Sequence, residues 1–124
     1  MQDLTIKQTS STPGVYLNGS TGKIEFYGKS LPEDVHGFFK PIINWINEYL
    51  ENPGVDTRVI CKMEYINTAS SKLMLDILCR LKELNLKGKK TSVEWYYDED
   101  DEDLYDTGKD YCDITGINFT FFPN

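Results

Sequence analysis

Residues 57–84 read TRVICKMEYINTASSKLMLDILCRLKEL, which predicts one strand followed directly by one helix. Apolar and polar side chains alternate through residues 57–65, as in a strand with one buried face. The apolar side chains expected to point inward are Val59, Cys61, Met63 and Tyr65. From Leu73 to Leu84 the apolar residues recur at three- and four-residue steps instead, which indicates an amphipathic helix. Residues 67–72, here called the junction segment, therefore lie where the helix begins.

The chain on either side adds further strands and helices. Upstream, short strands are expected at residues 4–8, 15–17 and 23–27. Downstream, a strand is expected at 91–97, a short helix at 104–114 and a last strand at 119–122. Residues 18–22 are expected to form a hairpin loop, and Gly28 to end the third strand. This order predicts a single α/β domain over residues 1–124, in which a mixed sheet with an N-terminal β-hairpin packs against helices.

A long helical pattern between these strands contains a proline. The pattern opens at Pro32, Glu33 and Asp34 and stops at Asn52, Pro53 and Gly54. Pro41 lies inside it, where a proline removes one hydrogen bond and clashes one turn back. We therefore expect a kinked or two-part helix, broken near Gly37 or beginning anew at Lys40.

The composition indicates one buried core in a reducing compartment. The 124 residues are 40% hydrophobic, which suffices for one domain. No apolar run approaches the roughly 20 residues of a membrane span, so direct membrane insertion is not expected. The N-terminus does not resemble a signal peptide. Cys61, Cys79 and Cys112 are widely spaced, which predicts free thiols, no zinc site and a cytoplasmic location.

Most of the negative charge lies in one stretch. The formal net charge is −7, and without the six consecutive acids at 98–103, here called the acidic run, it would be −1. Such a run repels phosphate backbones, so nucleic acid is not an expected partner. Together with the preceding tyrosine it is a candidate docking patch for Arg and Lys of a partner protein. The patch consists of Tyr97, Asp98, Glu99, Asp100, Asp101, Glu102 and Asp103. Alternatively, these acids complement the dipole of the following helix and keep the surface soluble.

Signatures of catalysis are lacking. The chain has no glycine-rich phosphate-binding motif, and its one histidine, His36, lies off the apolar stripe. The acidic run lacks the alternating ligands and mid-loop glycine of an EF-hand. We therefore expect no catalytic residue, no metal and no cofactor. A metal-dependent enzyme that uses the acidic run is the weakest hypothesis.

The junction segment combines hydroxyl groups with a helix start. It contains Thr68, Ser70 and Ser71, flanked by Asn67 and Lys72. A helix start offers unpaired N–H groups and a partial positive charge, which favour an anion. A phosphate added there would change the local charge by about −1.5 to −2. The segment is therefore a candidate phosphorylation switch and partner-binding site. Alternatively, its hydroxyls serve as ordinary helix caps.

Two blocks of the chain resemble the SiaC family of bacterial regulatory phosphoproteins. Residues 64–72, EYINTASSK, are similar to the family block EYFNTSSSK, and residues 95–103 closely resemble its block WYYDEDDED. Ile66 and Ala69 depart from the first block. Supporting matches lie at residues 11–13, 28–33 and 108–110.

The resemblance implies a fold like that of STAS-domain anti-sigma-factor antagonists, with Thr68 as the phosphorylated residue. It also implies a kinase related to anti-sigma-factor kinases and a PP2C-type phosphatase. The unmodified form would bind and activate a diguanylate cyclase, raising cyclic di-GMP and promoting biofilm growth. The leading hypothesis is thus a non-enzymatic partner-switching phosphoprotein. The alternative is a constitutive protein-binding module in which Thr68 only caps a helix.

Overall fold

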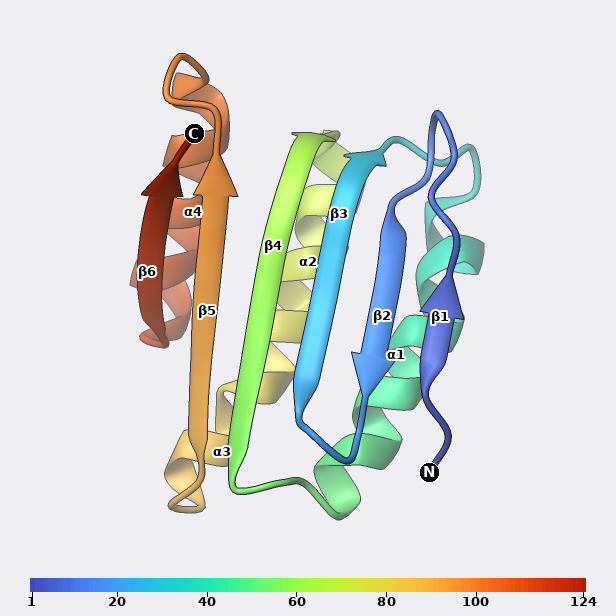
Figure 1. Ribbon diagram of the computed structural model, residues 1–124, viewed down its shortest axis with the longest axis vertical. Coiled ribbons are helices and arrows are strands. Elements are labelled where there is room, and N and C mark those ends of the chain that lie inside the picture. The colour runs from blue at the N-terminus through green and yellow to red at the C-terminus, as the bar shows by residue number, and fades with distance from the viewer.

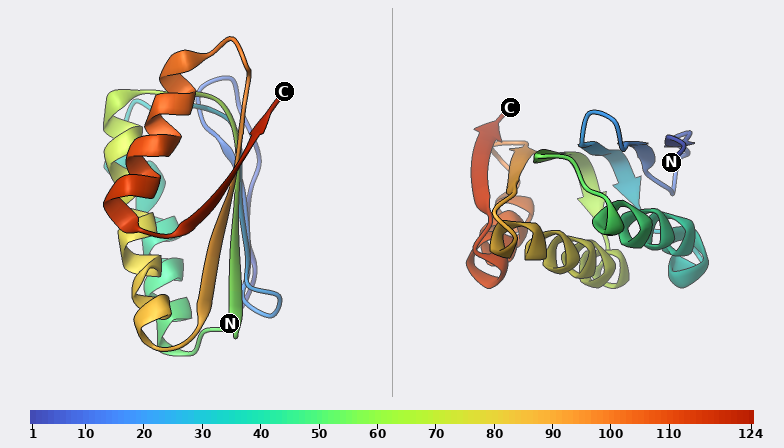
Figure 2. Two further views of the ribbon diagram at one scale, coloured as in Figure 1. Left: turned by 90° about the vertical axis from the view of Figure 1, so that its left-hand side faces the viewer. Right: turned by 90° about the horizontal axis from the view of Figure 1, so that it is seen from below.

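The computed structural model describes residues 1–124 as one six-stranded sheet with all its helices on a single side (Figures 1 and 2). The strands are β1 (Leu4–Ile6), β2 (Gly14–Asn18), β3 (Lys23–Ser30), β4 (Asp56–Ile66), β5 (Lys90–Tyr97) and β6 (Asn118–Pro123). The helices are α1 (Val35–Glu51), α2 (Thr68–Leu81), α3 (Glu83–Leu86) and α4 (Glu102–Thr115). None of them is both long and apolar enough to span a bilayer. The mixed α/β fold expected from the sequence is confirmed.

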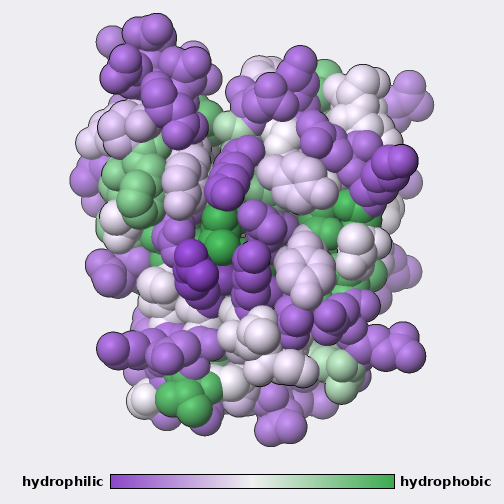
Figure 3. All heavy atoms as spheres, viewed as in Figure 1, coloured by the Kyte–Doolittle hydropathy of each residue, from purple (hydrophilic) through white to green (hydrophobic).

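The placement of the helices follows from the order of the strands. β1, β2 and β3 pair antiparallel, whereas β3, β4, β5 and β6 pair parallel in chain order. Every crossover between parallel strands therefore steps in the same direction across the sheet. Right-handed crossovers that step one way place their helices on the same face. The opposite face of the sheet is open, and Figure 3 views it directly.

The core fills the space between the sheet and the helix layer. Alternate strand residues point into it, as the two-residue period predicts. Trp95 is fully buried while its neighbour Tyr96 is half-buried on the open face. The Trp95 indole donates to the Leu104 carbonyl at 3.1 Å. A Cβ at Gly108 would lie 2.6 Å from the Trp95 Nε1, so this glycine lets α4 lie close to β5.

The end of β3 differs from the prediction. The strand does not stop at Gly28 but continues for two residues, and Gly28 has φ +91°, a region that favours glycine. Beside it the register with β4 shifts: Gly28 pairs with Met63, but Lys29 pairs with Tyr65. Glu64 is therefore the extra residue of a β-bulge. Tyr65, which alternation predicted to point inward, is 51% exposed.

The predicted division of this segment into two helices is wrong, because one helix runs from Val35 to Glu51 with Pro41 inside it. Asp34 caps this helix by accepting from the Gly37 N–H at 3.0 Å. The carbonyl that lacks a donor because of Pro41 is that of Gly37, four residues earlier. Both residues are exposed, so water can satisfy the carbonyl.

Candidate functional site

The junction segment lies at the edge of the sheet where β3, β4 and β5 end (Figure 1). α2 begins at Thr68, and the residue before it, Asn67, is the cap. The Asn67 Oδ1 accepts from the Ser70 N–H at 2.8 Å, and the Asn67 N–H donates to the Ser30 carbonyl at 3.0 Å. The capping role that the alternative hypothesis gave to Thr68 therefore belongs to Asn67.

The three hydroxyls of the junction segment have different surroundings. Ser70 is fully buried, and its Oγ accepts from the Ser30 Oγ at 2.8 Å. The Ser71 Oγ lies 2.7 Å from the Tyr111 hydroxyl. Thr68 is exposed, as are Ala69 and Lys72. Thr68 therefore carries the one hydroxyl of this segment that faces solvent freely.

Tyr111 attaches the start of α2 to α4. Its hydroxyl donates to the Ser71 carbonyl at 2.7 Å. Because a phenol has a single proton to donate, the Ser71 hydroxyl must be the donor in the second contact between these residues. Burial raises the pKa of Tyr111 above its ordinary value, so the hydroxyl stays neutral and keeps donating at physiological pH. The start of α2 is thus fixed by β3 on one side and by α4 on the other.

An open hollow with a volume of about 1110 Å³ lies at the same edge of the sheet. Pairing between β4 and β5 ends at Cys61 and Trp95, although both strands continue. Residues beyond that point line the hollow, among them Lys62 and Glu64 of β4 and Tyr96 of β5. Figure 3 shows the hydrophilic loop that protrudes beside it, at the upper left. The hollow therefore forms where two neighbouring parallel strands separate.

The acidic run borders this hollow, and part of it also has structural roles. The run's lining residues are Asp98, Asp100, Asp101, Glu102 and Asp103. Asp101 caps α4, because its carboxylate accepts from the Leu104 N–H at 2.9 Å. Asp98 accepts from the Asp100 N–H at 2.9 Å. Glu102 and Asp103 occupy the first turn of α4, where acids suit the helix dipole. Both interpretations of the run therefore have a structural basis.

The two tyrosines before the acidic run lie on opposite faces of the sheet. Tyr97 lies on the helix-covered face, where its ring is 5.1 Å from that of Tyr105. Tyr96 lines the hollow instead, stacked 4.6 Å from Phe122. Alternation along β5 accounts for this, because Tyr96 lies on the face opposite Trp95 and Tyr97. The hollow's Lys29, Lys62 and Glu64 had no comparable sequence signal, because they meet the acidic run only through the packing of separate strands.

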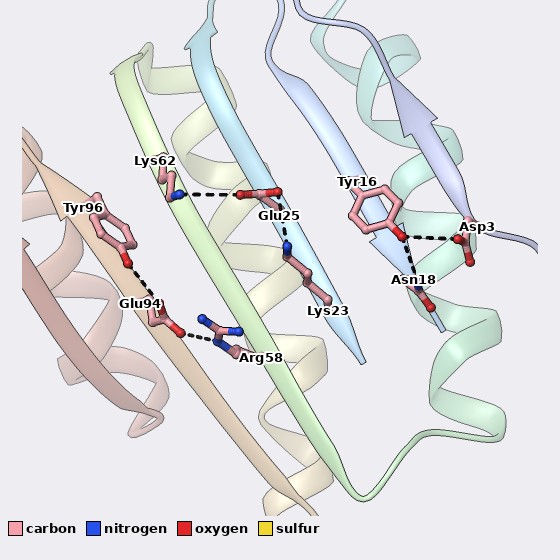
Figure 4. Close-up of polar contacts among 9 residues, drawn as sticks. All are labelled: Asp3, Tyr16, Asn18, Lys23, Glu25, Arg58, Lys62, Glu94 and Tyr96. Carbon is pink, nitrogen blue, oxygen red and sulfur yellow. Dashed lines mark hydrogen bonds and ion pairs between the residues drawn. The ribbon is translucent and has the colours of Figure 1, made fainter. Parts of the chain in front are cut away.

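The open face beside the hollow carries a set of polar contacts (Figure 4). Glu94 accepts from Arg58, and this hydrogen bond lowers the pKa of the Glu94 carboxyl. Tyr96 donates to the same carboxylate at 3.1 Å, and the Lys62 Nζ lies 5.1 Å from the centre of the Tyr96 ring. No group of three or more His, Cys, Asp or Glu side chains is arranged to hold a metal ion. The end of the sheet thus presents charged and aromatic side chains beside the hollow.

The comparison with known proteins is decisive for the family. Residues 6–124 match the family model of SiaC family regulatory phosphoproteins. The chain belongs to the SiaC family. An uncharacterized protein of Pseudomonas aeruginosa (strain UCBPP-PA14) is 31% identical over 119 residues, which cover 96% of this chain and 94% of the relative.

Solved SiaC structures share the whole fold. Apo-SiaC from Pseudomonas aeruginosa has a TM-score of 0.89 and 28% identity, over 98% of this chain and 99% of that chain. A chain in the crystal structure of the diguanylate cyclase SiaD with its activator SiaC, from the same organism, has a TM-score of 0.90 and 28% identity. The match covers 98% of this chain and 100% of that one. The family and fold expected from the sequence are therefore confirmed.

Proposed function

We propose that this SiaC-family chain is a non-enzymatic regulator whose unphosphorylated form binds and activates a diguanylate cyclase. Phosphorylation of Thr68 would end that binding, so that the chain switches between partners. The exposed position of Thr68 carries the proposal, since Ser70 and Ser71 are engaged inside the protein. In support, the related SiaC of Pseudomonas aeruginosa is the activator of the diguanylate cyclase SiaD.

The proposed cycle needs two further proteins. A kinase related to anti-sigma-factor kinases would add the phosphate, and a PP2C-type phosphatase would remove it. The output would be cyclic di-GMP and, through it, biofilm growth. We place the cycle in the cytoplasm, the compartment that the three free cysteines favour.

A phosphate on Thr68 would alter the surface without disturbing the fold. Thr68 is the first residue of α2, where the helix dipole favours negative charge, and Lys72 follows one turn later. Asn67 caps the helix and does not depend on the Thr68 hydroxyl. The added dianion would therefore be accommodated by the free domain. At an interface it would cost desolvation, because a dianion would replace a neutral hydroxyl on the surface that meets the cyclase.

Variants at position 68 test the proposal. Thr68→Ala should bind the purified cyclase of the source organism as the unmodified protein does, and stoichiometrically phosphorylated protein should bind about 100-fold more weakly. Thr120→Ala, which changes an exposed threonine of β6, serves as the control. Peptide mass spectrometry of protein from native cells should find the phosphate on Thr68. Equal binding by the phosphorylated and unmodified forms would refute the switch.

A further inference from the structure

The β-bulge at Glu64 determines which side of the sheet Tyr65 occupies. In an unbroken register Tyr65 would pair with Ser30, whose side chain faces the helix layer and contacts Ser70. With the extra residue, Tyr65 pairs instead with Lys29 on the open side of the sheet. A bulge thus moves one aromatic side chain out of the core and into solvent two residues before the junction segment begins.

Along the chain, Tyr65 lies between Glu64, which lines the hollow, and Thr68, the proposed switch residue. Thr68 follows Tyr65 by three residues, and Leu31, which is 40% exposed, comes directly after β3. Glu64, which precedes Tyr65, and Lys29, which pairs with Tyr65 across the sheet, both line the hollow. An exposed aromatic centre beside a charged rim is the arrangement found at protein interfaces.

We propose that Tyr65 is the apolar anchor by which this chain holds its partner protein. The partner would present an apolar pocket flanked by Arg or Lys side chains, which complement the acidic run that lines the same hollow as Glu64. This inference rests on the proposed function, because the partner it addresses is the diguanylate cyclase. It adds which residue supplies the affinity and what chemistry the cyclase surface offers to it.

Binding of the purified full-length cyclase of the source organism tests the anchor. Tyr65→Ser should weaken binding by about 30-fold, the loss typical of a central aromatic residue. The loss should be equal at about 0.1 M and about 1 M salt, because apolar contact is not screened. Tyr65→Phe, which keeps the ring, should retain most of the affinity. Leu86→Ser is the matched control, since Leu86 is 85% exposed and belongs to α3, which lies near the opposite end of the sheet (Figure 1).

The outcomes separate this inference from the proposed function. If the unmodified chain binds the cyclase but Tyr65→Ser binds equally well, the anchor is refuted and the proposed function stands. The anchor is also refuted if Leu86→Ser loses as much affinity as Tyr65→Ser. If the unmodified chain binds no cyclase, the proposed function fails and the anchor fails with it. Thermal melting checks that Tyr65→Ser stays folded. If it does not, the affinities of Tyr65→Phe and Tyr65→Leu for the cyclase are compared at both salt concentrations. Weaker binding by Tyr65→Leu supports the anchor, and equal binding refutes it.

Discussion

Ser30 and Ser70 form a buried hydrogen bond that fixes the start of α2 against β3. Ser70→Ala would leave the Ser30 hydroxyl buried without its acceptor. We expect the free energy of unfolding to fall by about 1–3 kcal/mol, measured by urea unfolding. The double variant Ser30→Ala/Ser70→Ala should lose less than the sum of the two single variants, because neither hydroxyl is then left alone. Additive losses would show that the two serines do not stabilise each other.

Cys61 makes stability depend on pH in the alkaline range. Burial raises the pKa of its thiol from 9.0 to about 12. The folded protein therefore keeps a proton that the unfolded chain releases above about pH 9, so the free energy of unfolding falls as pH rises from there toward 12. Cys61→Val should make this decline shallower, by up to about 1.4 kcal/mol per pH unit.

Urea unfolding at several alkaline pH values would measure the effect of Cys61. The matched control is Cys79→Val, which removes a half-buried thiol of α2. The slope of Cys61→Val should differ from that of the control as well as from that of the unmodified protein. Identical slopes for all three proteins would mean that the buried thiol does not control alkaline stability.

At the scale of elements, α1 tolerates a proline in its interior at a measurable cost. Pro41 is exposed, so Pro41→Ala removes no core packing and restores an N–H for the Gly37 carbonyl. We expect the free energy of unfolding to rise by about 1–3 kcal/mol. Lys40→Ala, at the neighbouring exposed position, should change it by much less. Thermal and urea unfolding would measure both, and a destabilised Pro41→Ala would contradict this explanation.

The order and type of the elements, apart from the short α3, could be read from the sequence because the local periods are clear. The alternation of residues 57–65 and the three- and four-residue steps after Leu73 gave β4 and α2. Two features could not be read. The continuity of α1 through Pro41 depends on which side of the helix faces solvent. The bulge at Glu64 depends on how β4 meets β3, and the pattern of β4 alone continues unbroken to Tyr65.

The candidate site was predictable in part, for similar reasons. The junction segment and the acidic run are contiguous in sequence, so both were identified from the chain alone. The difference between Thr68, Ser70 and Ser71 was not, because it depends on Ser30 and Tyr111, which are 40 residues from their partners. The hollow likewise depends on the separation of β4 from β5 after their last paired residues.

At the scale of the whole molecule, the negative charge is concentrated at one edge of the sheet. Glu99→Gln, Asp100→Asn and Glu102→Gln together would change the formal net charge from −7 to −4 and leave the α4 cap, Asp101, in place. We expect association with a cyclase that has a basic surface to slow several-fold at low ionic strength and to differ little at high salt.

A variant with the same net charge distinguishes position from total charge. Glu33→Gln, Glu48→Gln and Glu51→Gln neutralise three exposed acids in and beside α1. This variant should associate at nearly the unmodified rate. Stopped-flow measurements at two salt concentrations would compare the proteins. Equal slowing by both variants would assign the effect to total charge, and no slowing by either would leave the run with capping and solubility alone.

The stepwise order of the strands also determines where the two ends of this chain lie. Asn124 donates to the Tyr97 carbonyl at 2.8 Å and accepts from the Glu99 N–H, so it adjoins the acidic loop and lines the hollow. Met1 precedes β1, which is the outermost strand on the side of the sheet away from β6. It lies toward the end of the sheet opposite the hollow (Figure 1). An affinity tag or fluorophore attached after Asn124 would therefore crowd the surface whose binding is to be measured. Immobilisation through the N-terminus leaves that surface free.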